Sequence, residues 1–208
     1  MSFSGFHEED FNVFSIDGLE KRMQGIQEKI QPKFKEIGDA LAQDLSMSIG
    51  NEMYLHIAKH ARRSVNPPKD TWLAIVDNKR GYKKHPHFQV GLFDDHVFVW
   101  LAFIYELPNK DTIAQKFINN LDMIKKMIPG DFVISQDHMK KHADPLDSMD
   151  KEDFRKILER FRDVKKAEFL VGKHFPKKSE LLSDGQAFLQ EVNRIYEELL
   201  PLYKMIKE

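Results

Sequence analysis

The chain has 208 residues, of which 41% are hydrophobic, and its 32 basic and 33 acidic residues leave a formal net charge of −1. This composition fits one soluble domain with its own core, and no apolar run approaches the roughly 18 residues that a membrane span needs. Cysteine is absent, which excludes disulfides, thiolate metal sites and cysteine nucleophiles. We expect a cytoplasmic protein without a membrane partner.

The first part of the chain predicts helix. Asp17 followed by Glu20 has the spacing of a capping box, and apolar residues then recur at helical spacing as far as Leu45. Pro32 interrupts this stripe, which therefore predicts two consecutive helices or one kinked helix. We expect Gly50 to end the helix.

The middle of the chain changes to the alternation of apolar and polar residues that is typical of strands. Two alternating runs flank Asp94-Asp95 and predict a β-hairpin, although this turn signal is weaker than Asp-Gly. We expect about four strands, largely antiparallel, between residues 52 and 105. Their apolar runs lie near residues 53–57, 72–76, 88–92 and 97–103.

The last part of the chain returns mainly to helical periodicity. The patterns predict helices over residues 111–128, 154–161 and 179–206, short strands over 132–135 and 168–175, and a polar loop over 137–150. The whole pattern predicts a single α+β domain over residues 1–208, in which helices pack against a largely antiparallel sheet of about four to six strands.

Positive charge is concentrated in residues 56–87. This segment holds eight of the 32 lysines and arginines, four of the nine histidines and only two acidic residues. Its formal charge is therefore +6, whereas the other 176 residues carry −7. Such a patch attracts anions, most often phosphate.

The basic residues fall in two stretches on either side of one predicted strand, residues 71–77. Pro67-Pro68 holds the end of the first stretch extended, and Gly81 provides a turn in the second. If neighbouring strands pair, the two stretches meet, and we expect them to form one electropositive hollow open to solvent. Whether residues 53–62 are extended or helical, the spacing also places His56 and His60 side by side.

The favoured hypothesis is a binding protein for a phosphate-bearing ligand, either a nucleotide or RNA. Arginine offers a planar fork of donors that fits phosphate, lysine adds a mobile charge, and tyrosine can stack on a base. The candidate ligand-binding residues are Lys59, Arg62, Arg63, Asn66, Arg80, Tyr82, Lys83, Lys84, His85 and His87.

Two other hypotheses stay open. In the first, the protein is a metal-independent phosphodiester-cleaving enzyme, with His56 or His60 as general acid or base and Arg62 and Arg80 stabilising charge on the phosphoryl group. In the second, it is a structural or interaction module, in which the arginines pair with carboxylates and the prolines and Gly81 only shape turns.

The sequence assigns no metal site and no cofactor. His56/His60, His138/His142 and His85/His87 have ligand-like spacing, but none includes the glutamate of a zinc-protease helix. Pro86 restricts the backbone of His85 to an extended conformation. His138 and His142 lie in a polar, lysine-rich loop, which is a poor setting for a rigid pair of ligands. Glycine-rich phosphate loops and the nucleophile elbow of hydrolases are also absent.

The two stretches HIAKHARRSVNPPKDTW and RGYKKHPHFQVGL, together with most of the remaining chain, resemble the YktB-like family of uncharacterised proteins from low-GC Gram-positive bacteria. The resemblance implies a cytosolic, single-domain α+β protein. It implies no activity, substrate or catalytic residue, so the functional hypotheses depend on the residues alone.

Overall fold

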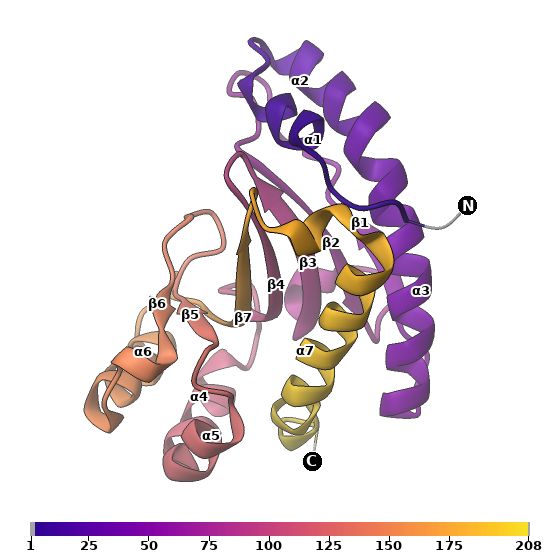
Figure 1. Cartoon of the computed structure of the whole chain (residues 1–208). Coiled ribbons are helices and arrows are strands. Elements are labelled where there is room, and N and C mark those ends of the chain that lie inside the picture. Colours follow the sequence, from indigo (N-terminus) through magenta and orange to yellow (C-terminus); the bar gives the residue numbers. More distant parts are fainter. Residues whose placement is uncertain (1–2, 208) are drawn as a thin grey trace.

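A seven-stranded antiparallel sheet forms the centre of the computed structural model, which describes residues 3–207 (Figure 1). The strand order is β1-β2-β3-β4-β7-β5-β6. The strands are β1 (Tyr54–Ile57), β2 (Asp70–Val76), β3 (His87–Phe93), β4 (His96–Phe103), β5 (Val133–Ser135), β6 (Asp144–Pro145) and β7 (Phe169–Pro176). The α+β fold is confirmed, and the two-residue β6 takes the sheet one strand beyond the expected range.

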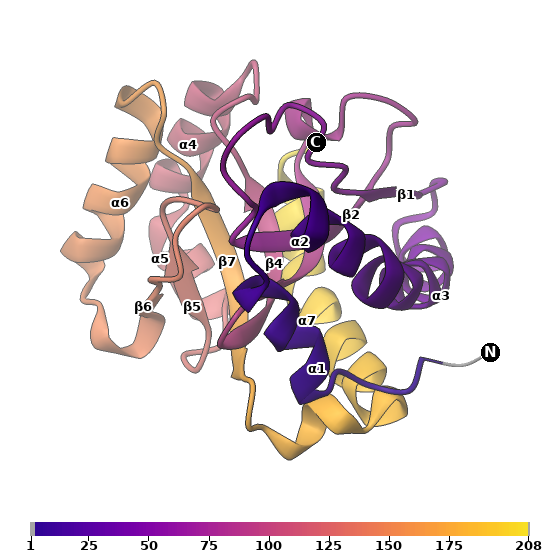
Figure 2. The ribbon, with the colours of Figure 1, turned by 90° about the horizontal axis from the view of Figure 1, so that it is seen from above.

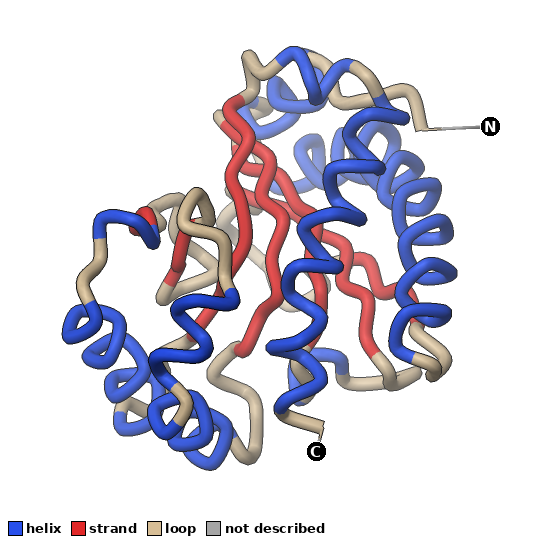
Figure 3. The backbone as a smooth tube through the Cα atoms, turned by 60° about the horizontal axis from the view of Figure 1, so that its bottom comes forward, coloured by secondary structure: helices blue, strands red, loops and turns tan. Residues whose placement is uncertain are grey.

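The helices form two groups around this sheet. They are α1 (Glu8–Asn12), α2 (Leu19–Gly25), α3 (Gln31–Ile49), α4 (Lys110–Asn119), α5 (Leu121–Met127), α6 (Lys151–Asp163) and α7 (Gly185–Met205). α3 packs against β1 and β2, and α7 packs against β4 and β7. The helices α4, α5 and α6 form the second group, which packs beside β7 and contacts α7 through α5 (Figure 3). Nowhere in residues 3–207 is a helix both long and apolar enough to cross a lipid bilayer.

The first helices confirm one sequence prediction and correct another. α2 and α3 are joined by a π-helical turn, Ile26–Ile30, and Pro32 lies in the first turn of α3, so the helix is continuous with a local irregularity. The predicted capping box at Asp17 is wrong. The N-cap is Gly18, whose φ of 85° suits glycine, and no side chain caps α2.

Burial explains why the sheet has two different faces. Alternate strand residues such as Leu73, Val90 and Val99 point into the main core with α3 and α7. The intervening residues, including Trp72 and Trp100, form a second cluster on the other face. The residues packed against this cluster lie in the 3₁₀ turn after β2, in β5 and in the loop after β5: Tyr82, Val133 and Ala143. Figure 2 shows the loops beyond β1 and β2 on the side away from α7. The candidate site lies on this loop-covered face.

Candidate functional site

A solvent-open hollow of about 340 Å³ lies where the two basic stretches meet the loop after β5. Its wall contains four cationic side chains, two aromatic rings and two histidines. These are Lys59, Arg62, Arg63, Lys83, Trp72, Tyr82, His60 and His138. No acidic residue within the described range 3–207 lines it. The structure therefore brings residues of both basic stretches to one hollow.

Strand pairing places these residues. The pairing of β1 with β2 continues one residue beyond β1, since the Ala58 N–H donates to the Trp72 carbonyl at 2.9 Å. The chain then turns at His60, the only described non-glycine residue with positive φ, at 50°. From the other side of β2, the 3₁₀ turn Tyr82–Lys84 returns to the same place, and Trp72 Nε1 donates to Tyr82 Oη at 3.1 Å.

The cations on the wall are largely uncompensated. Lys59, Arg62 and Arg63 form no ion pair with any part of the chain between residues 3 and 207. The nearest polar partner of Arg63 is the Asn66 carbonyl, at 3.4 Å. Only Lys83 has a carboxylate close by, with Nζ 3.7 Å from Glu106. Three of the four cations on the wall are therefore without a carboxylate partner among residues 3–207.

His60 is held as a neutral ring. Its Nε2 lies 3.1 Å from Thr71 Oγ1, and its ring meets the Trp72 ring edge to face at 5.6 Å. Burial lowers the pKa of His60 to about 4, and the charges of Arg63 and Lys83 add to this effect. A histidine with this pKa carries no proton to donate near neutral pH.

Half of the predicted site residues lie outside the hollow: His56, Asn66, Arg80, Lys84, His85 and His87. Residues 53–62 are neither extended throughout nor helical, since β1 ends at Ile57 and the chain turns at His60. His56 and His60 therefore bond different partners. His56 donates from Nε2 to the Asn78 carbonyl, 3.0 Å away.

His87 does not line the hollow but contacts Tyr82, which does. It is completely buried, and its ring lies edge to face with Tyr82 at 5.2 Å. Its Nδ1 donates to the His85 carbonyl, while Gln89 donates to its Nε2. Burial lowers its pKa to about 4. His87 is therefore a neutral, hydrogen-bonded core residue, and its ring supports the ring of Tyr82.

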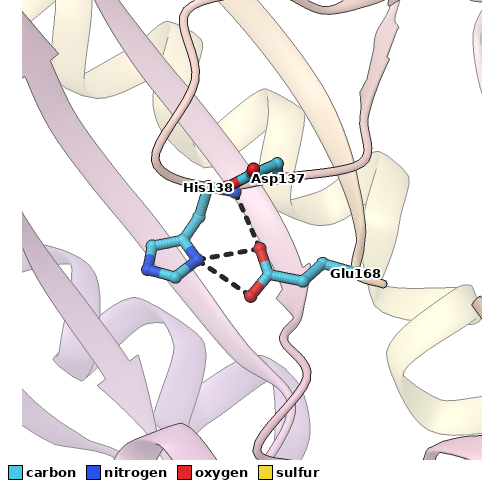
Figure 4. A group of neighbouring side chains, drawn as sticks. All are labelled: Asp137, His138 and Glu168. Carbon is cyan, nitrogen blue, oxygen red and sulfur yellow. Dashed lines mark hydrogen bonds and ion pairs between the residues drawn. The ribbon is translucent and has the colours of Figure 1, made fainter. Parts of the chain in front are cut away.

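Sequence reasoning considered His138 only as half of the His138/His142 pair, and it missed both its place in the wall of the hollow and its buried partner, Glu168 (Figure 4). His138 Nδ1 lies 2.8 and 2.9 Å from the two carboxylate oxygens, and its backbone N–H donates to the same carboxylate at 2.7 Å. The two side chains are only 9% and 2% exposed. Thirty residues separate them, so no local pattern could have indicated this pair.

Asp137 joins His138 and Glu168 in a group whose ligand atoms lie within 4.8 Å of one another, close enough to share a cation. Each member already has internal partners. Asp137 accepts from the Met139 N–H at 3.0 Å and lies 3.3 Å from Lys140 Nζ, and Glu168 accepts from His138. The group is thus explained by the hydrogen bonds that fix the loop.

Asp70 is a second buried ionisable residue near the hollow that the sequence patterns did not single out. It is completely buried, and neither carboxyl oxygen has a hydrogen-bond partner within the described structure. Burial raises its pKa to about 6, although the charges of His138, Arg63 and Lys83 act in the opposite direction. The interior beside the hollow therefore contains an unpaired carboxyl group.

Comparison with known proteins gives matches along almost the whole chain. The model of a family described as a domain of unknown function, DUF1054, matches residues 6–203. A UPF0637 protein of Oceanobacillus iheyensis is 59% identical over 97% of this chain and 96% of its own length. A UPF0637 protein of Shouchella clausii is 57% identical over 99% of this chain and 96% of its own length. One of Listeria monocytogenes is 51% identical over 98% of each chain.

Proposed function

The chain belongs to the DUF1054 family, in agreement with its resemblance to the YktB-like proteins. On this premise we propose that the protein binds a nucleotide, held by its phosphate, in the basic hollow. The observation that carries this proposal is the set of four cations on a wall without an acidic residue. Isolated phosphate groups are recognised by such clusters of arginine and lysine.

The rest of the hollow suits the remainder of a nucleotide. Trp72, Tyr82 and Met139 supply aromatic and apolar surface between the cations. A volume of about 340 Å³ falls within the range of small-molecule sites, which combine apolar walls with a few placed polar groups. A ligand with one flat apolar part and one phosphate therefore matches both kinds of wall.

The geometry favours binding over catalysis by the two histidines first considered. His56 lies outside the hollow. The Nε2 atom of His60 is already hydrogen-bonded to Thr71, and its low pKa leaves it without the extra proton that a general acid needs. The uncompensated state of Arg62 and Arg63 also argues against a purely structural role, in which these side chains would be paired with carboxylates.

We expect the Arg62→Ala/Arg63→Ala double variant to bind AMP at least about tenfold more weakly, because each charge-assisted hydrogen bond contributes about 1.5–3 kcal/mol. Isothermal titration calorimetry at low and high salt measures this affinity. Affinity should also fall as salt rises, since the phosphate exchanges its counterions for protein cations.

Arg80→Ala is the matched control, because Arg80 belongs to the second basic stretch but does not line the hollow. It should leave AMP affinity unchanged. Equal AMP affinity in the wild type and the double variant would refute the proposed site. Binding of an RNA oligonucleotide but not of AMP would instead identify a nucleic-acid interface.

A further inference from the structure

The strongest unexplained feature of the hollow is the orientation of His138. Glu168 holds its Nδ1, and Figure 4 shows the other ring nitrogen on the side of the ring away from Glu168. His138 lines the hollow, and its Nε2 has no hydrogen-bond partner within residues 3–207. The ring is also fixed by an edge-to-face contact with Trp72, at 5.7 Å between centroids.

This arrangement determines the tautomer of His138. A carboxylate can only accept hydrogen bonds, so Nδ1 carries the proton that points at Glu168. In the neutral ring Nε2 then has a free lone pair, which is the form that a general base requires. The backbone N–H of His138, bonded to the same carboxylate, fixes the loop as well as the ring.

Charged groups beside His138 complete a reaction site. Arg63 and Lys83 line the same small hollow and can stabilise negative charge that develops on phosphoryl oxygens. Lys83 Nζ lies 5.9 Å from the centre of the Trp72 ring, the ring that His138 contacts from another side. A phosphate held by these cations would occupy the same hollow that His138 lines.

We propose that His138 is the general base of a phosphodiester hydrolase and that Glu168 is its positioning residue. This inference rests on the proposed phosphate-binding function. Water attacks the phosphorus atom of the bound diester and transfers a proton to His138 Nε2. The phosphorus–oxygen ester bond breaks, its electron pair stays on the leaving oxygen, and this oxygen takes a proton from solvent. His138 then returns its proton to solvent.

The chemistry of the base favours a diester over a monoester. Transfer from a monoester proceeds through a loose transition state with little bonding to the nucleophile, so removal of the nucleophile's proton contributes little. Attack on a diester forms more of the new bond in the transition state, and a positioned base then matters more. General-base catalysis typically accelerates such steps by about 10²- to 10⁴-fold.

A merely structural role for the pair makes a different prediction. Glu168, just before β7, accepts from the His138 N–H in the loop after β5 and from the Tyr105 N–H after β4, at 3.4 Å, so it joins three segments. Loss of that connection would lower stability and ligand affinity together. Loss of a base would lower kcat and leave both unchanged.

The test uses the full chain with bis(p-nitrophenyl) phosphate as the diester probe, and AMP binding is measured in parallel. We expect hydrolysis by the wild type, a loss of about 100-fold or more in kcat for His138→Gln, and unchanged AMP affinity. Glu168→Gln should lower kcat with little change in KM. Free imidazole should partly restore the rate of His138→Gly, which no structural role explains.

His142→Gln is the matched control, since His142 lies in the same loop, is 78% exposed at its side chain and bonds only Asp144 among residues 3–207. It should retain full activity. If the His138 variants do not fold, diethylpyrocarbonate modification of wild-type His138, with protection by AMP, tests the position of Nε2 directly.

Two outcomes overturn the inference alone: AMP binding without diester hydrolysis, or hydrolysis that survives His138→Gln. Preferential hydrolysis of p-nitrophenyl phosphate would overturn the assignment to diesters, and failure of AMP to protect His138 would overturn the position of the base. If the wild type does not bind AMP, the proposed function itself fails.

Discussion

Asp70→Asn is expected to stabilise the folded protein by about 3 kcal/mol at pH 8 and to have little effect below pH 4. The figure follows from the rise of the Asp70 pKa from 3.8 to about 6, because each pKa unit corresponds to about 1.4 kcal/mol. The asparagine variant removes the buried negative charge while it preserves the shape of the side chain.

The sign follows from proton binding. Between pH 3.8 and pH 6 the folded state holds a proton on Asp70 that the unfolded state has lost. The stabilisation linked to this proton is complete below the unfolded pKa and disappears as pH rises through the folded pKa. Above pH 6 the wild type must keep an ionised carboxylate in an interior where neither oxygen has a hydrogen-bond partner among the described residues.

Urea unfolding of both proteins at intervals from pH 4 to pH 8 measures this difference. Asp147→Asn is the control, because Asp147 is exposed and its replacement should leave the pH dependence unchanged. Parallel stability–pH curves for the wild type and Asp70→Asn would show that folding does not shift the Asp70 pKa.

Gly172→Ala is expected to destabilise the protein by about 3 kcal/mol or more, at the upper end of the range for overpacked interiors. Gly172 lies in β7 opposite Trp100 of β4. A Cβ atom at this position would lie 1.9 Å from the Val99 carbonyl oxygen and 3.1 Å from the Trp100 Cα. These are backbone atoms of the paired strand, so they can move only if the sheet itself distorts.

Gly130→Ala provides a matched control for chemical unfolding measurements. The nearest atom to its added Cβ is the Asp147 Cβ, at 3.7 Å, which is an ordinary contact. Its free energy of unfolding should stay within about 1 kcal/mol of the wild-type value. A similarly small change for Gly172→Ala would show that β4 and β7 separate without strain.

The elements that the sequence predicted well are those with strong local signals. The hairpin around Asp94-Asp95 is the pair β3 and β4, and Gly50 ends α3 with a φ of 76°. The helix predicted over residues 111–128 is divided at Asn120 into α4 and α5, a change that apolar spacing alone does not indicate. Local periodicity reports which face of an element is apolar, but it does not report small breaks between elements.

The candidate site was predicted in part because charge is visible in composition. Lys59, His60, Arg62, Arg63, Tyr82 and Lys83 do line one hollow, since antiparallel pairing brings the chain before β2 close to the chain after it. His87 could not be distinguished from its neighbours in this way. Its position in β3 turns the side chain into the buried layer beneath Tyr82.

The sequence by itself determined the α+β fold, the antiparallel hairpin and the concentration of positive charge in residues 56–87, because these follow from local periodicity and composition. Only the tertiary structure decided which cations share the hollow, and it alone joined His138 to Glu168 and buried Asp70 beside them. Contacts between residues far apart in the chain depend on how loops and strands pack. Burial then decides which of those residues are charged.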